Sequence, residues 1–354
     1  MTLNKKEISE IKKLFGPNKC CLTKICGCYV SHEKEKIMVS KNTFLSLPDE
    51  EAFKYFDIFK KTLSGKIGKT LYNLSYPTKT DNELQKSLIA LKDTKLTDDE
   101  VLEAFYDKVI ETYTFAENYF IILAHGVYDV PGKTSDDTLM EDASEEVYSH
   151  IICSICPVQL DTPGLTYSSD DGRFTEKIRS WLVNKPMTGF LFPSFTDRTS
   201  NVHEILYYNK DTKVMNEEFI TDCLGTNRML SYQEQVDCFR DAIPKDISFE
   251  KYDQIQESIN EIAGRKEDSE SESFTPEDMN KLLTNVDMET ECEMGCPITL
   301  GNVSGKKKIK LSDAVIAADE TCDLSIQLVN GRKCLVIPIN GIEMEYNGVT
   351  VAAD

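Results

Sequence analysis

The chain has 354 residues, of which 40% are hydrophobic and 28% are charged, and this is the composition of a globular protein with one large core or two smaller ones. The formal net charge of −20 repels phosphate backbones, so no nucleic-acid partner is expected. No stretch approaches the roughly 20 apolar residues of a membrane span, and the N-terminus lacks the apolar core of a signal peptide. We therefore expect a cytoplasmic protein with no membrane partner.

Helical periodicity and one hairpin pattern dominate the N-terminal part of the chain. Apolar residues at helical spacing predict helices over residues 5–15, 48–63 and 82–91. A further helix is predicted to open with a capping box that runs from Thr97 to Glu100. After the first helix, the segments LTKICGCYVS and IMVS flank the charged run HEKEK, a pattern typical of a β-hairpin.

Strongly apolar segments in the middle of the chain predict a sheet. The segments 119–130 and 147–160 are rich in Ile and Val and predict central strands. GFLFPSF and VHEILYY predict two more strands, and Pro193 places the first at a sheet edge or beside a bulge. Helices follow in the sequence at about 216–224, 231–242 and 249–263. The predicted fold class is α+β (mixed α/β), with a central, mostly antiparallel sheet flanked by helices.

Composition changes divide the chain into three predicted parts. Residues 1–264 form a mixed α/β domain, and residues 265–274 form an acidic, serine-rich linker without apolar anchors. Residues 275–354 form a short helix and a small β-meander module. The meander prediction rests on three Asn-Gly pairs, which begin at Asn330, Asn340 and Asn347 and favour type I′ hairpin turns. The run Lys306–Lys308 is interpreted as a solvated turn.

Several segments together resemble a known family. They are NKKEISEIKKLFGP, ICGCYV, IFKKTLSGKIGK, ASEEVYSHIICSICPVQL and GFLFPSFTDRTSNVHEILYY. The chain resembles an uncharacterised bacterial family, catalogued as domain of unknown function four-three-one-seven and found mainly in anaerobic Firmicutes. The resemblance covers roughly the first two-thirds of the chain and weakens in the C-terminal module. It implies a bacterial cytosolic protein and supplies no activity, cofactor or site residue.

The cysteines suggest candidate metal ligands. Cys153 and Cys156 lie in a predicted strand, where positions three apart point to opposite faces, so they are not expected to bind one ion. Cys26 and Cys28 are two apart and share a face, and with His32 they form a candidate zinc site that needs a fourth ligand. The alternative for every cysteine is a small buried hydrophobe in a reducing cytosol.

A third cysteine pair precedes the predicted meander. Cys292 and Cys296 lie in a turn-like segment, and their spacing fits a zinc knuckle that Cys322 and Cys334 would complete. Core packing explains Cys334 equally well, because it lies in a predicted strand.

A polar cluster, FTDRTSNVHE, follows a predicted strand and offers Asp197, Arg198 and His203 as candidate catalytic residues. Asp and His serve as general bases or metal ligands, and Arg holds anions. Ligand groups often follow strands in this way in α/β proteins. His125, Asp129 and Asp142 follow or end another strand and are candidates to join them. The alternative is a loop held by Asx turns and a surface Arg–Asp pair.

No complete catalytic signature occurs in the sequence, and neither GxGxxG nor GxxxxGK[ST] is present. The first hypothesis is therefore a non-enzymatic cytosolic protein that binds an unidentified protein or small molecule. A metal-dependent hydrolase or nuclease-like enzyme is the second, and a zinc-stabilised structural protein is the third. No cofactor is predicted, and zinc enters only through the last two hypotheses.

Overall fold

The computed structural model describes residues 4–77, 82–133, 139–244, 247–265, 269–288, 294, 297–310, 315–338, 343–346 and 349–352. The chain divides into two compact units, Met1–Glu234 and Gln235–Asp354. The units do not divide at the predicted linker, residues 265–274. The helix predicted at 249–263 belongs to the second unit, because its buried Ile255 and Ile259 join the same cluster as Leu282 and Leu283.

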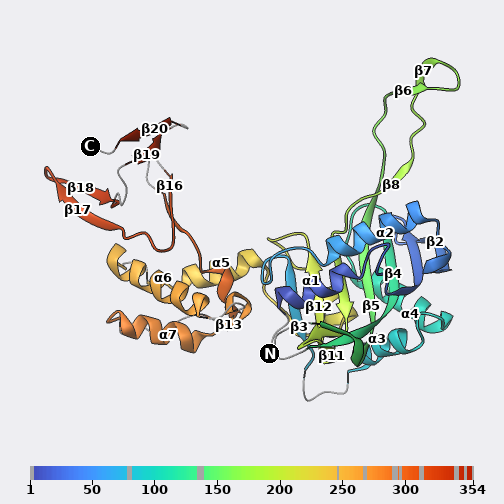
Figure 1. The fold of residues 1–354 in the computed structure, drawn as a ribbon, viewed down its shortest axis with the longest axis horizontal. Helices are drawn as coiled ribbons and strands as arrows, with labels where there is room; N and C mark the ends of the chain where they lie inside the picture. Colours follow the sequence, from blue (N-terminus) through green and yellow to red (C-terminus); the bar gives the residue numbers. More distant parts are fainter. Residues whose placement is uncertain are drawn as a thin grey trace. The chain divides into compact units, whose positions relative to one another are not determined.

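An antiparallel sheet of eight strands forms the centre of the first unit (Figure 1). Its strands are β1 (Leu22–Val30), β2 (Lys36–Thr43), β3 (Leu71–Ser75), β4 (Tyr119–Lys133), β5 (Leu139–Leu160), β8 (Trp181–Val183), β9 (Thr188–Phe192) and β12 (Glu204–Asn209). The strand order is β2-β1-β4-β5-β9-β12-β3, and β8 pairs with the end of β5. The predicted β1–β2 hairpin is confirmed. The predicted fold class, a mixed α+β protein with an antiparallel sheet, is confirmed as well.

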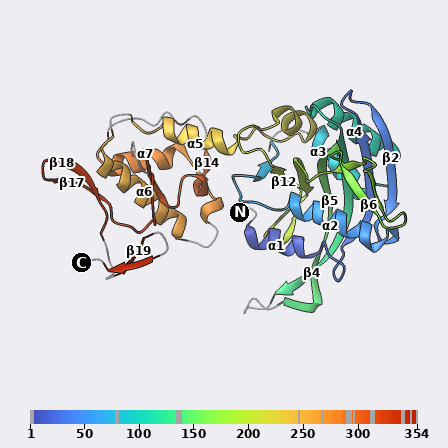
Figure 2. The ribbon, with the colours of Figure 1, turned by 90° about the horizontal axis from the view of Figure 1, so that it is seen from above.

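Helices cover both faces of this sheet. Figure 2 shows α1 (Lys5–Lys13) and α2 (Asp49–Thr62) on one side, and α3 (Glu83–Asp93) and α4 (Asp99–Thr112) on the other. Two shorter helical turns, η1 (Phe44–Ser46) and the π-helical η2 (Phe219–Cys223), complete the helices of the described part of this unit. The predicted capping box of α4 is wrong, because Asp98 rather than Thr97 accepts the backbone N–H groups of Glu100 and Val101. In the described residues, no helix combines the length and apolarity needed to cross a membrane.

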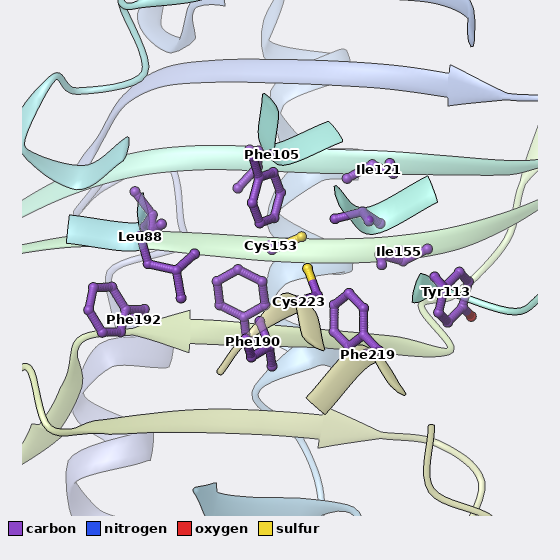
Figure 3. Packing of buried hydrophobic residues seen from close by; sticks show 14 of the residues in the cluster. Leu88, Phe105, Tyr113, Ile121, Cys153, Ile155, Phe190, Phe192, Phe219 and Cys223 are labelled. Carbon is purple, nitrogen blue, oxygen red and sulfur yellow. The ribbon is translucent and has the colours of Figure 1, made fainter. Parts of the chain in front are cut away.

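The sheet separates two buried clusters, and the phase of strand β5 decides which residue enters which cluster. Cys153 packs under α3 and α4, whereas Cys156 packs on the face covered by α1 and α2. Figure 3 shows Cys153 beside Cys223 and among the rings of Phe105, Phe190 and Phe219. The prediction that Cys153 and Cys156 point to opposite faces is therefore confirmed, and the pair does not chelate a metal.

Pro193 does not mark a sheet edge. Strand β9 lies in the middle of the sheet, between β5 and β12, and Pro193 immediately follows its last residue. Beyond Pro193 the chain leaves the sheet and forms a short hairpin of β10 (Ser194–Thr196) and β11 (Thr199–Asn201). The prediction of an edge strand was wrong because the proline ends the strand and removes no ladder hydrogen bond within it.

A long two-stranded ribbon, here called the arm (residues 158–183), extends away from the sheet of the first unit (Figure 1). Its base is formed by β8 and the last residues of β5. Its outer part is formed by β6 (Leu165–Ser168) and β7 (Arg173–Glu176), which pair with each other. The sequence does not predict the arm, because its short strands carry few consecutive apolar residues.

The second unit combines helices with short strands. Its helical segments are α5 (Tyr232–Asp241), which starts just before the division, α6 (Phe249–Gly264), η3 (Ser269–Ser271), α7 (Pro276–Asn285) and η4 (Leu300–Asn302). Its strands are β13 (Ser273–Phe274), β14 (Ile298–Thr299), β15 (Lys307–Lys310), β16 (Val315–Ala318), β17 (Ser325–Val329), β18 (Arg332–Val336), β19 (Glu343–Tyr346) and β20 (Val349–Ala352). Phe274, in the predicted linker, is buried in the core of this unit.

The predicted four-stranded meander is only partly present. The hairpin at Asn330-Gly331 joins β17 to β18, and both turn residues have positive φ, 52° and 78°, as a type I′ turn requires. The pairs that begin at Asn340 and Asn347 lie outside the described residues. Among the described strands, β15–β16, β17–β18 and β19–β20 form separate two-stranded ladders. The turns predict local hairpins correctly, but they do not determine whether hairpins join into one sheet.

Candidate ligand-binding pocket

Asp197 and Arg198, two of the three predicted catalytic residues, form the tip of the β10–β11 hairpin. Thr196 pairs with Thr199 across this hairpin, and the two intervening residues have φ values of 53° and 57°. Two successive positive φ values are those of a type I′ turn, which suits a two-residue hairpin loop. Asp adopts this conformation more readily than most residues, and the side chain of Asp197 is exposed. The turn therefore accounts for Asp197 at this position.

The side chain of Arg198 is bound to helix α1. Its Nε donates to both carboxylate oxygens of Glu10, at 3.3 and 3.1 Å, and its Nη2 donates to Oε1 of Glu10 at 3.0 Å. Nη2 also donates to the carbonyl oxygen of Pro131 at 2.8 Å. The hydroxyl of Tyr128 donates to the same carboxylate at 2.8 Å. The guanidinium therefore fixes the hairpin to α1, and the donors on its Nε and Nη2 are engaged within the protein.

His203 does not join Asp197 and Arg198 in a common site. Its backbone N–H donates to Oδ1 of Asn201 at 3.1 Å, and its carbonyl oxygen accepts from the backbone N–H of Tyr76 at 3.0 Å. Its side chain is exposed. Arg198 points to α1, whereas the other two side chains face solvent. The predicted catalytic group is thus dispersed, because the hairpin directs its members differently.

The residues expected to join that group are also separated. His125 is buried in β4, with Nδ1 2.6 Å from Oγ1 of Thr23 and Nε2 3.0 Å from Oγ of Ser149. Burial lowers the pKa of His125 to about 4, which keeps its ring neutral at physiological pH. Asp129 is exposed, and Asp142 lies outside the described side chains. His125 therefore contributes to the interior of the first unit.

The structure also separates His32 from the other two predicted zinc ligands, Cys26 and Cys28. The two cysteines share one face of β1, as predicted, and are 1% and 0% exposed in the cluster under α3 and α4. His32 lies beyond the end of β1, after a register shift between Tyr29 and Val30, and its side chain is 64% exposed. Burial raises the pKa of each of the two thiols to about 11. Both are therefore protonated and resemble small core residues.

Other cysteines do not complete this set. Cys20 and Cys21, which precede β1, pack against the cluster on the other face of the sheet, under α1 and α2. Cys292 and Cys296 lie outside the described residues, and their predicted partners Cys322 and Cys334 are partly exposed. In the described part of the chain, no three His, Cys, Asp or Glu side chains form a group that could hold a metal ion.

The second unit contains a cavity of about 860 Å³. It lies between α5, α6 and the segment that leads into β15. Its apolar wall is formed by Val236, Phe239, Ile243, Pro244, Ile247, Tyr252 and Val303. Its polar lining is formed by Arg240, Asp241, Gln256, Asn302, Lys306, Lys307 and Lys308. Small-molecule pockets have similar volumes and combine apolar walls with a few polar groups.

A glycine holds one side of this cavity in place. The backbone N–H of Gly305 donates to Oδ1 of Asn260 at 2.7 Å, and Nδ2 of Asn260 donates to the carbonyl oxygen of Gly305 at 3.3 Å. Gly305 has a φ of 114°, a backbone conformation that residues with a Cβ rarely adopt. These bonds attach the loop to α6, so the first residues of β15 are held beside the cavity.

The three lysines of β15 and its approach have different environments. The ammonium of Lys307 lies 2.8 Å from Asp253 and 3.1 Å from Glu257, and its side chain is only 5% exposed. Burial alone would lower the pKa of Lys307, but the hydrogen bonds to both carboxylates raise it above its ordinary value. Lys306 and Lys308 are exposed. The prediction of a solvated turn was therefore wrong, because Lys307 is bound to α6.

The sequence does not predict this cavity, because its walls come from segments that are distant in the chain. One signal was present. Asp253 and Glu257 lie four residues apart, on one face of a helix, and a lysine-rich strand follows later in the chain. That pattern indicates a cation held against the helix, but it does not place apolar residues around it.

The fold and this cavity define a mixed α+β protein with a candidate binding pocket in its second unit. The chain belongs to the family Domain of unknown function (DUF4317), whose model matches residues 3–349. The match confirms the resemblance noted in the sequence and extends it through the C-terminal part. No curated protein and no solved structure matches the chain.

Proposed function

We propose that this protein is a non-enzymatic, cytoplasmic binding protein of bacteria, and that its second unit binds an anion with an apolar body. One observation carries the proposal: the cavity combines an apolar wall with a mainly cationic rim, in which Asp241 is the one carboxylate. Ile243 and Ile247 lie on the wall, and Arg240 and Lys308 lie on the rim. An aromatic or acyl carboxylate, sulfonate or phosphate matches this arrangement, because its body covers the wall while its anion meets the rim.

The charges of the rim support an anionic ligand. The whole chain has a net charge of −20, so a local group of cations contrasts with the acidic composition of the rest of the chain. Arg240 pairs with Asp237 at 2.7 Å, but its side chain is 68% exposed, and such exposed ion pairs are weak. Lys308 forms no ion pair with any described residue. Both cations are therefore available to a ligand at little cost.

The wall supports a ligand with an apolar body. Phe239 and Val303 are buried in the core of the second unit and form the base of the cavity. Tyr252, at its side, remains 37% exposed. A ligand that covers such surface gains about 25 cal/mol for each Å² removed from water.

The thiols and the family support the proposed cellular location. The described cysteines are unpaired, and free thiols in this number are typical of a reducing compartment. The resemblance to a family of anaerobic Firmicutes supports a bacterial source. An enzymatic role as a hydrolase or nuclease has less support, because Arg198 is bound to Glu10 and the side chain of His203 faces solvent.

Titration of the full-length protein with anilinonaphthalene sulfonate, a fluorescent anion with an aromatic body, tests the proposal. We expect saturable binding at one site, and displacement of the probe by decanoate. Lys308→Glu reverses the charge of the rim and should weaken binding about tenfold, equivalent to about 1.4 kcal/mol. Ile243→Trp fills the cavity and should abolish binding.

Lys310→Glu is the matched control. Lys310 is also exposed on β15, two residues from Lys308, but it does not line the cavity. It should bind the probe as the unmodified protein does. Equal loss of affinity in both variants, or unchanged binding by Ile243→Trp, would show that the probe binds elsewhere and would overturn the proposal.

A further inference from the structure

The arm is one continuous antiparallel ribbon from its base to its tip. Val158 pairs with Val183 at the base, and Ser168 pairs with Arg173 at the tip. Between the two ladders, the backbone N–H of Asp161 donates to the carbonyl oxygen of Ser180, at 2.9 Å. The N–H of Lys177 donates to the carbonyl oxygen of Gly164, at the same distance. These bonds keep one register along the whole arm.

A constant register assigns the side chains of the arm to two faces. One face carries an apolar stripe of Leu165, Tyr167, Phe174 and Ile178, which are 77%, 59%, 71% and 90% exposed. The exposed Glu176, opposite Leu165, is the one charged side chain on this face along the outer part of the arm. The rings of Tyr167 and Phe174 stand opposite each other, with centroids 5.5 Å apart. Leu182, at 48% exposed, continues the stripe toward the base.

The other face of the arm is polar along its outer part. It carries Arg173, Lys177 and Arg179, and between them the opposed pair Thr166 and Thr175. The outer part of the arm is therefore amphipathic, and a two-stranded ribbon with an uncovered apolar face is at best marginally stable in water. Monomeric proteins rarely expose a contiguous group of large apolar side chains of this kind.

We propose that the apolar stripe is an interface between two copies of this chain, in which the two arms pack face to face about a two-fold axis. A two-fold interface joins the same surface of both copies, so one stripe suffices to form it. Large apolar side chains at these exposures offer about 500 Å² from each copy, or about 1,000 Å² in total. That area reaches the lower limit of specific interfaces.

The charges and the geometry of the arm favour a second copy over a lipid surface. The tip that would enter a bilayer first is Ser169–Gly172, which contains Asp170 and Asp171 and no apolar residue. The apolar residues lie along the shaft instead. A net charge of −20 also repels an anionic membrane.

The length of the arm reduces the repulsion between two such acidic chains. Each side of the arm is eleven residues long, from Val158 to Ser168 and from Arg173 to Val183, and at 3.3 Å per residue the ribbon spans about 35 Å. This length exceeds the screening distance of about 8 Å at physiological ionic strength. Contact through the arms therefore brings apolar surfaces together while the sheets to which they are attached stay apart.

Sedimentation velocity of the full-length protein tests the proposal, over a hundredfold range of concentration up to about 100 µM. We expect the mass to rise with concentration toward twice the 40.1 kDa of one chain. The double variant Tyr167→Glu/Phe174→Glu puts two carboxylates into the stripe and should remain monomeric. The matched control Thr166→Glu/Thr175→Glu puts the same charges on the opposite face and should dimerise.

A monomer at every concentration, or a dimer that persists in the Tyr167→Glu/Phe174→Glu variant, would overturn the proposal. Co-sedimentation with vesicles of phosphatidylcholine and phosphatidylglycerol that is lost in this variant would assign the stripe to a membrane and also overturn it. All variants should retain the far-ultraviolet circular dichroism of the original protein, because the arm lies outside the core. The result is independent of ligand binding by the second unit.

Discussion

The two units of this protein cover their apolar residues in different ways. In the first, helices lie on both faces of an eight-stranded sheet, and side chains such as Phe190 are completely buried. In the second, one cluster around Phe239 and Ile255 lies beside an open cavity, and Tyr252 remains 37% exposed. Central strands are buried on both faces, whereas two-stranded ladders are not. The sheet of the first unit thus buries its apolar side chains on both faces, whereas the second unit leaves some of them exposed beside the cavity.

The largest expected effect on the free energy of unfolding comes from a buried residue of the first unit. Phe190→Ala removes a fully buried ring from the middle of the sheet and should lower the free energy of unfolding by about 3–5 kcal/mol. The same change at Phe174, which is 71% exposed on the arm, should alter it by no more than about 0.5 kcal/mol in the monomer. Urea denaturation followed by circular dichroism measures both. Equal effects at the two positions would contradict the difference in packing.

The next expected effect is a loss of stability at low pH, caused by two histidines buried in the same sheet. Burial lowers the pKa of His125 to about 4 and that of His150 to about 3, both from an ordinary value of 6.5. Between about pH 3 and 6.5 the unfolded chain therefore binds protons that the folded chain does not. The free energy of unfolding should fall as pH drops below 6.5, by about 1.4 kcal/mol per histidine at pH 5.5.

Variants at single histidines separate this effect from other titrating groups. His125→Gln and His150→Gln should each reduce the loss of stability between pH 7.5 and 5.5, whatever their stability at neutral pH. His32→Gln is the control, because His32 is 64% exposed and its variant should show the original pH dependence. An unchanged pH dependence in both buried variants would show that these rings are protonated in the folded protein.

The sequence predicts those features that depend on local geometry. The faces of Cys153 and Cys156 were predicted correctly, because successive residues of a strand alternate between faces. The same rule placed Cys26 and Cys28 together. It failed for His32, because β1 ends at Val30 after a register shift, and no periodicity extends beyond the end of a strand.

The features that the sequence does not predict depend on contacts between distant segments. Lys307 was assigned to a solvated turn, but it is bound by Asp253 and Glu257, and the cavity beside it is lined by three separate segments. Arg198 was assigned to catalysis because its neighbours are polar. Its partner, Glu10, lies in the first helix, and neither spacing nor composition connects the two residues.

The last prediction tests the contact between Arg198 and Glu10. Arg198 and Glu10 are 13% and 20% exposed, and the guanidinium makes three hydrogen bonds to the carboxylate. Arg198→Ala should lower the free energy of unfolding by about 1–3 kcal/mol, because charge-assisted bonds are lost and the carboxylate loses its counter-ion. Glu10→Gln combined with Arg198→Ala should cost less than the sum of the single changes, since the two residues interact.

Asp197→Asn is the matched control at the next position. Asn retains the preference for positive φ, and the side chain of Asp197 is exposed, so stability should change by no more than about 0.5 kcal/mol. Additive costs in the double variant would mean that Arg198 and Glu10 do not stabilise each other. Arg198 would then be available to bind an anion, as the sequence suggested. The first unit would in that case offer a cation to a ligand, as the second unit does with Lys308.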